Sequence, residues 1–259
     1  TMNNYEKLEG MVAATFTPLD ENGDVNLSVI DKYADWIAST PIKGVFVCGT
    51  TGEFSSLTID ERKLILEKWL VSARKRFKVI AHVGSNCQRS AMELARHAAQ
   101  VGADAIASIA PSFFKPGTVD ELVDFFAPIC HSAAGLPFYY YNMPSITGVN
   151  LPVDKFLVEG KKKIPNLVGT KFTHNNLMEM GVCIELEQHR FEVLHGYDEI
   201  LISGLAMGAV AGVGSTYNYI PNVYQAIFDS MKMNDLETAR HNQIKSIRTV
   251  EVIIKYGGG

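Results

Sequence analysis

Eight short, almost wholly apolar segments recur along this 259-residue chain, and they limit its fold more than any other feature. Each predicts a β-strand, because it is brief and rich in β-branched or aromatic residues. The segments are residues 12–16, 44–48, 79–83, 105–110, 138–141, 167–172, 191–195 and 210–214. Amphipathic helical stretches, among them 28–37, 60–76 and 88–101, separate them. Strands that alternate with helices pair in parallel, and strands that are buried on both faces are apolar throughout.

Eight strand–helix units predict an α/β protein that folds as a (β/α)8 barrel, the TIM barrel. The alternative is an open doubly wound sheet, which usually carries a glycine-rich dinucleotide fingerprint after its first strand. Here the first strand is followed by residues 16–20, Phe-Thr-Pro-Leu-Asp, instead. Because no linker or low-complexity segment interrupts the chain, we expect a single domain over residues 1–259. The stretch 235–255 predicts one more helix, so residues 235–259 are expected to form a partial C-terminal helical extension.

Composition argues against several classes of function. The net charge is −4, from 24 basic and 28 acidic residues, so no basic surface is expected to bind nucleic acid. The most apolar stretch, 200–213, is interrupted by glycines and is too short for a membrane span. The histidines are scattered without metal-ligand spacing, and His82 and His195 are expected in the core.

The cysteines and the N-terminus favour a reduced, cytoplasmic protein. The four cysteines are widely spaced and form no C-x-x-C pair, which argues against a zinc site or a disulfide framework. They are Cys48, Cys87, Cys130 and Cys183. Residues 1–6 lack the basic and apolar regions of a secretory signal.

One lysine stands at the C-terminal end of a predicted strand. The segment 167–173 is apolar until its end and then carries Lys171. Active sites of such barrels lie at this end of the strands. Partial burial disfavours the ammonium and so favours a neutral amine, which forms Schiff bases with ketones. The alternative is a lysine that extends into solvent just beyond the strand.

Two further segments supply polar groups at the same end of the barrel. Thr50 and Thr51 lie between glycines after the second strand, so their amides and hydroxyls suit a carboxylate; the alternative is a simple tight turn. If Tyr141 at the end of the fifth strand faces inward, its phenol lies near Lys171 and suits a proton relay. The alternative is aromatic packing, which we expect for Tyr140.

The last two strands end in groups that suit a polyol. Asp198 and Glu199 follow the seventh strand, and we expect one carboxylate to bind hydroxyl groups and the other to cap the next helix. Ser215 follows the eighth strand and adds a hydroxyl. Of the eight arginines only Arg89 is expected near this face, so a phosphorylated sugar is a poor candidate.

Taken together, the motifs resemble the N-acetylneuraminate lyase / dihydrodipicolinate synthase superfamily, class I aldolases that form a Schiff base with pyruvate. The matching segments are 49–53, 139–144, 169–171 and 212–218. Residues 196–199, Gly-Tyr-Asp-Glu, look like the pattern of the sialic acid lyases. The synthase branch carries an arginine where this chain has Ile146. Alternatives are the synthase, a 2-keto-3-deoxy sugar acid aldolase, or a catalytically silent barrel.

The resemblance implies a mechanism and an assembly. Lys171 would form the imine with the substrate ketone, Tyr141 would move the proton, and Thr50 and Thr51 would hold the carboxylate. The residues implied in binding the sugar hydroxyls are Thr173, Gly196, Asp198, Glu199 and Ser215. Sialic acid and pyruvate would be the ligands, with no metal and no cofactor besides the covalent Schiff base. The resemblance also implies a homotetramer built as a dimer of dimers.

Two features depart from the family pattern. Many relatives place a tyrosine in the loop after the fourth strand, where this chain has Phe113. Proton transfer must then use Tyr141, groups of the substrate, or water. Relatives also continue with further C-terminal helices, so the extension at 235–259 is expected to be a truncated one.

Overall fold

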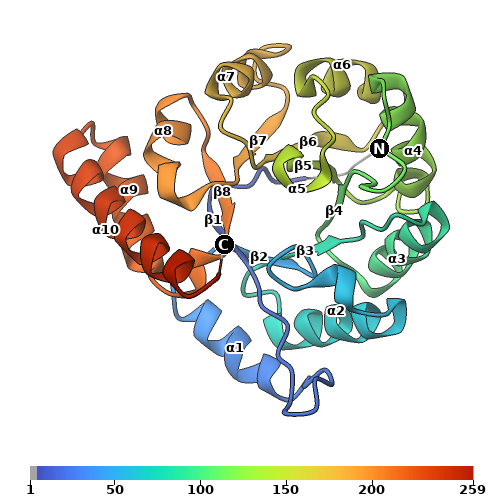
Figure 1. The fold of residues 1–259 in the computed structure, drawn as a ribbon, viewed down its shortest axis with the longest axis horizontal. Coiled ribbons are helices and arrows are strands. Elements are labelled where there is room, and N and C mark those ends of the chain that lie inside the picture. The colour runs from blue at the N-terminus through green and yellow to red at the C-terminus, as the bar shows by residue number, and fades with distance from the viewer. Residues whose placement is uncertain (1–4, 259) are drawn as a thin grey trace.

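Eight parallel strands close into one barrel at the centre of the molecule (Figure 1). The computed structural model describes residues 5–258, so most of the N-terminal stretch 1–6 considered above lies outside the described residues. The strands are β1 (Gly10–Ala14), β2 (Gly44–Val47), β3 (Lys78–His82), β4 (Ala105–Ile109), β5 (Phe138–Asn142), β6 (Leu167–Phe172), β7 (Glu192–His195) and β8 (Ala211–Gly214). The closed order β1 to β8 confirms the TIM barrel and excludes the open sheet. The first strand lies two residues earlier than predicted.

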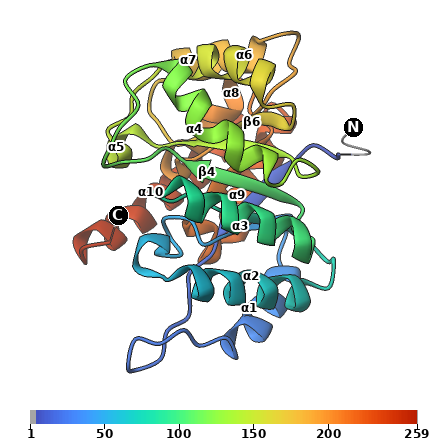
Figure 2. The same ribbon diagram turned by 90° about the vertical axis from the view of Figure 1, so that its right-hand side faces the viewer.

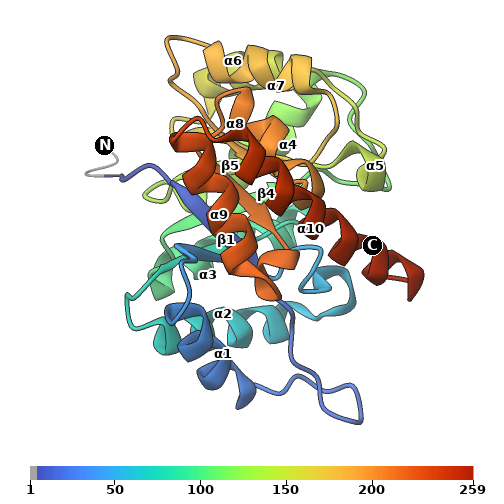
Figure 3. The same ribbon diagram turned by 90° about the vertical axis from the view of Figure 1, so that its left-hand side faces the viewer.

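Helices surround the barrel on its outside (Figure 1). They are α1 (Val29–Ala38), α2 (Ile59–Ala73), α3 (Gln88–Val101), α4 (Val119–His131), α5 (Pro144–Thr147), α6 (Val153–Lys163), α7 (Leu177–Glu185), α8 (Leu201–Ala206), α9 (Pro221–Lys232) and α10 (Leu236–Lys255). Three short 3₁₀ turns are η1 (Phe54–Ser56), η2 (Asp198–Ile200) and η3 (Thr216–Asn218). The helix predicted at 235–255 is therefore confirmed as α10, which lies along α9 (Figure 3). No helix within residues 5–258 is long and apolar enough to cross a membrane.

The strands are buried on both sides, as their composition predicts. Side chains that point into the barrel form one apolar cluster, which includes Phe46, Tyr139 and Tyr141. Side chains that point outward form a second cluster under the helices, and Tyr140 belongs to it, packed against Phe156. Successive side chains of one strand therefore pack into the two different clusters, because side chains alternate in direction along a strand.

The two ends of the barrel carry different elements. The turns α5, η2 and η3 each follow the C-terminal end of a strand, so they mark the end at which barrel enzymes place their sites. Figures 2 and 3 show α5 and the end of α10 on one side, and the segment that leads into β1 on the other. The candidate site therefore lies at the end of the barrel where α10 projects.

Candidate active site

Lys171 lies inside the barrel mouth. It pairs in register with Tyr141 of β5 and with Leu194 of β7, and its side chain is only 5% exposed. Its Nζ lies 3.8 Å from the centroid of the Tyr141 ring and 4.5 Å from that of Phe46. Among residues 5–258, no carboxylate lies within ion-pair distance of this amine. The lysine therefore does not extend into solvent, and its nitrogen is enclosed by aromatic rings.

Tyr141 joins the lysine strand to the loop after β2. Its hydroxyl lies 3.0 Å from Oγ1 of Thr50 and 3.1 Å from the sulfur of Met143. The inward orientation predicted for Tyr141 is confirmed, as is the outward packing of Tyr140. The phenol of Tyr141 thus has a hydroxyl partner, and its ring lies against the amine.

The loop at residues 49–53 is a tight turn and also presents free amides. The carbonyl of Thr50 accepts from the amide of Glu53 at 2.9 Å, and the carbonyl of Gly52 accepts from the hydroxyl of Thr17 at 2.6 Å. Cys48 and Glu53, with φ of 55° and 56°, bracket the turn in the left-handed region. Within the described chain, the amides of Thr50 and Thr51 donate to no protein acceptor. Free neighbouring amides of this kind form anion-binding concavities.

The carboxylate of Asp198 is turned away from solvent. Its Oδ2 accepts from the amide and the hydroxyl of Thr216, at 2.8 and 2.5 Å. Its Oδ1 has no hydrogen-bond partner among residues 5–258 and lies against Gly214, where an added Cβ would come within 1.7 Å. Burial raises the pKa of Asp198 to about 6, although the bonds from Thr216 oppose the rise. One of the two carboxylates was predicted to cap the next helix. Both lie in the first turn of η2, as that prediction requires, but η2 has no side-chain cap bond, and Asp198 bonds to Thr216 at the start of η3 instead.

The other residues predicted to bind a polyol surround this group. Gly196, Glu199 and Ser215 are partly exposed, whereas Thr173 is 4% exposed. In the described part of the chain Oγ1 of Thr173 has no hydrogen-bond partner, and it packs against Gly196, where a Cβ would come within 2.0 Å of it. Gly196, Glu199 and Ser215 are thus open to a ligand, while Thr173 and Asp198 form the wall behind them.

Three contributors were not found by sequence reasoning. Arg62 of α2 is 4% exposed and donates to backbone carbonyls at the end of β3, although only Arg89 was expected near this face. Gln243 and Ser246 of α10 donate to the carbonyl of Asp198, at 3.0 and 3.4 Å. A polar residue within an amphipathic helix gives no signal of such long-range contacts. The two core histidines, by contrast, are buried as predicted.

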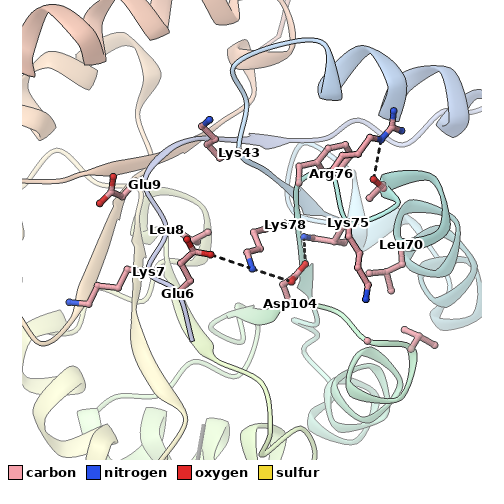
Figure 4. Close-up of a pocket in the computed structure, with 15 residues that line it drawn as sticks. Glu6, Lys7, Leu8, Glu9, Lys43, Leu70, Lys75, Arg76, Lys78 and Asp104 are labelled. Atoms are coloured by element: carbon pink, nitrogen blue, oxygen red, sulfur yellow. Dashed lines mark hydrogen bonds and ion pairs between the residues drawn. The ribbon is translucent and has the colours of Figure 1, made fainter. Parts of the chain in front are cut away.

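A hollow lies at the opposite end of the barrel (Figure 4). It encloses about 1130 Å³ and is lined by residues at the starts of β2, β3 and β4, including Lys43, Lys78 and Asp104. Lys78 approaches both Asp104 and Glu6, at 3.7 and 4.0 Å. None of the residues predicted for the site lines it, so we do not assign the chemistry to this end.

Comparison with known proteins settles the family. Residues 7–257 match the dihydrodipicolinate synthetase family. The chain belongs to this family. It is 42% identical to N-acetylneuraminate lyase of Mus musculus over 98% of this chain and 80% of the mouse protein. The structure of Proteus mirabilis N-acetylneuraminate lyase superposes with a TM-score of 0.95 at 36% identity, covering 97% of this chain and 85% of that one. A catalytic lysine mutant of Ruminococcus gnavus sialic acid aldolase superposes with a TM-score of 0.91 at 28% identity, covering 96% and 81%.

Proposed function

We propose that this chain is a class I aldolase that cleaves N-acetylneuraminate reversibly to N-acetylmannosamine and pyruvate. The observation that carries the proposal is the enclosed amine of Lys171, which lies against the ring of Tyr141 beside the free amides of Thr50 and Thr51. The open-chain sugar acid has a ketone next to a carboxylate. One ligand would therefore place its ketone at Lys171 and its carboxylate at the loop.

Lys171 and the loop at residues 49–53 act in the first step. Nζ of Lys171 attacks C2 of the ketone, and the carbinolamine loses water to give the imine. The amides and hydroxyls of Thr50 and Thr51 hold the C1 carboxylate, which fixes C2 at the amine and lowers the entropic cost of attack. The covalent imine is itself the electron sink, so no cofactor or metal enters the reaction.

Tyr141 then moves the proton. Its phenol gives its proton to the hydroxide that leaves the carbinolamine as water, and the phenolate then takes the C4 hydroxyl proton. The C3–C4 bond breaks, C4 becomes the aldehyde carbon, and the bonding pair passes into the protonated imine to give an enamine. N-acetylmannosamine leaves, C3 is protonated, and water releases pyruvate from Lys171. The hydroxyl of Thr50, 3.0 Å from the phenol, supplies the next partner for the proton. Phe113, which is 77% exposed, has no hydroxyl and so cannot take part in the proton transfer.

The sugar chain is assigned to the β7 and β8 side of the mouth. Glu199, Ser215 and the backbone of Gly196 bind its hydroxyls, and Asp198 and Thr173 complete the pocket from behind. A synthase reaction is less well supported, because Ile146, 62% exposed, stands where the synthase branch carries its arginine. The cation that does lie at the end of α5 is Lys115, packed against Gly148. We also propose a cytoplasmic homotetramer, a dimer of dimers, whose mass in solution would test the assembly.

The deciding experiment is intact mass after the protein is mixed with N-acetylneuraminate and borohydride. A single reduced pyruvyl adduct that maps to Lys171 is expected, and Lys43→Ala, at the other end of the barrel, serves as a control that keeps it. A whole-sugar adduct would show imine formation without cleavage and would contradict the lyase assignment. The absence of any adduct would leave the silent barrel as the better description.

A further inference from the structure

Arg62 is a buried cation without a counter-charge. It stands in the first turns of α2, four residues after the N-cap Thr58, and is 4% exposed. Within residues 5–258 no carboxylate lies within 4.0 Å of its guanidinium. Burial lowers the pKa of Arg62 to about 10, so it keeps its charge near neutral pH. An unpaired buried charge is costly, and such a cost usually marks a function.

The guanidinium lies close to both ends of the loop at residues 49–53. It interacts with the thiol of Cys48, directly before the loop, and lies 5.3 Å from the ring centroid of Phe54, directly after it. Burial raises the pKa of the Cys48 thiol to about 11, so the thiol is neutral and does not compensate the charge. The cation therefore lies near the residues that flank the loop, in buried surroundings where charges are poorly screened.

The same guanidinium fixes the end of β3. Nη1 donates to the carbonyl of Gly84 and Nη2 to that of His82, each at 2.7 Å. These two bonds tie α2 to the strand that adjoins β2. The planar fork of an arginine aims two N–H groups at two acceptors in a fixed geometry, which the single nitrogen of a lysine does not reproduce.

His82 extends the tie across three strands. Its Nδ1 lies 2.7 Å from the carbonyl of Cys48, and its Nε2 accepts from the amide of Ile109 at 3.2 Å. The carbonyl of Cys48 accepts, so Nδ1 must carry a proton. The amide of Ile109 donates, so Nε2 must be unprotonated, and the ring is therefore neutral. Burial, with Arg62 nearby, lowers the pKa of His82 well below its usual value, in agreement with this tautomer. The ring also packs edge-on against Tyr141.

We infer that Arg62, with His82, is a positioning residue for the 2-keto acid carboxylate. The pair holds Cys48 in its left-handed conformation, which aims the amides of Thr50 and Thr51, and the cation supplies positive potential behind them. The carboxylate of the ligand is the counter-charge that residues 5–258 do not supply. This inference rests on the proposed function, since it assumes that Lys171 forms an imine with the keto acid held there.

Borohydride trapping with two ketones tests the inference. Pyruvate carries the carboxylate, and methyl pyruvate presents the same ketone as a neutral ester. For each we would measure the half-saturating concentration and the maximal trapping rate. In Arg62→Met, pyruvate should need at least tenfold more ligand for half-saturation, with the maximal rate within about threefold of wild type and methyl pyruvate shifted less than twofold. A merely structural role would weaken both ketones equally, and that result would overturn the inference.

Two further variants make the result decisive. Arg62→Lys keeps the charge but loses the fork, so its pyruvate half-saturation should rise by only about threefold, again with methyl pyruvate unchanged. If Arg62→Met does not fold, the test rests on Arg62→Lys. A ratio of half-saturating concentrations for pyruvate and methyl pyruvate equal to that of wild type would then refute the positioning role. Arg96→Met, at an exposed site on α3, is the control and should match wild type. Failure of wild type to trap pyruvate would refute the proposed function itself, whereas normal trapping in every Arg62 variant would refute only this inference.

Discussion

The free energy of unfolding of Asp198→Asn, relative to that of wild type, should increase as pH rises. The substitution removes a buried charge and keeps the shape of the side chain. The pKa of Asp198 is about 6, against an ordinary 3.8, so the native protein holds a proton there that the unfolded chain releases. Because the folded pKa is raised, wild type loses stability as pH rises from about 4 to about 7, and asparagine does not share this loss.

The magnitude follows from the two pKa values. Their difference corresponds to a loss of about 3 kcal/mol on full ionisation, at ~1.36 kcal/mol per pH unit. Between pH 4.5 and pH 8, about 2 kcal/mol of this loss should be observed, since the unfolded group is already partly ionised at the lower pH. The amide nitrogen in place of Oδ1 has no acceptor, which costs roughly 1 to 3 kcal/mol, but that cost is the same at every pH.

Urea unfolding at fixed protein concentration measures the effect. The free energy of unfolding of Asp198→Asn minus that of wild type should grow by about 2 kcal/mol from pH 4.5 to pH 8. Asp229→Asn, at an exposed position on α9, is the control, and its difference should stay within about 0.5 kcal/mol. A difference that is flat or shrinks with pH would refute the account of Asp198 as a buried carboxylate that ionises at a cost.

Three other variants separate the parts of the site. Lys171→Ala should lose the rise in melting temperature that pyruvate gives wild type, and a rise in the variant would contradict imine formation at this amine. Tyr141→Phe should keep the fold but lower kcat for cleavage by about 10² to 10⁴, measured by pyruvate release; an unchanged kcat would remove Tyr141 from the proton path. Gln243→Ala leaves the amide of Ile202 without its bond and removes one of the two bonds to the carbonyl of Asp198, so unfolding should cost about 1 to 3 kcal/mol less. In Gln243→Ala, KM for the sugar should rise by a larger factor than the pyruvate concentration for half-saturation. Equal factors would argue against an effect confined to the sugar side of the site.

The barrel could be predicted because its signal is local and repeated. Each strand is recognisable alone, and eight strand–helix units have few ways to close. Closure then brings the C-terminal ends of the strands together, so Lys171 of β6 and Tyr141 of β5 become neighbours by register alone. Their contact required no knowledge of loops, because alternation along a strand decides which side chains face inward.

The orientation of the polar side chains could not be predicted in the same way. Asp198 follows a strand end and was expected to face a ligand or cap a helix, yet its carboxylate holds Thr216 eighteen positions later. That choice depends on the glycine at 214, which leaves room for Oδ1, and on α10, which binds the Asp198 carbonyl through Gln243. Each of these partners comes from a different part of the chain, so no window of sequence contains the arrangement.

Arg62 follows the same logic at the other side of the mouth. In the sequence it stands in the run Asp60-Glu61-Arg62-Lys63, which has the composition of an exposed helical turn. Helix periodicity cannot separate a cation that reaches inward over a strand end from one that points to water, because both occupy the same polar run. Only the three-dimensional positions of Cys48 and His82 distinguish them. The strands that carry the reacting groups are therefore set by local pattern, whereas the groups that aim and charge the site depend on contacts that exist only once the barrel has closed.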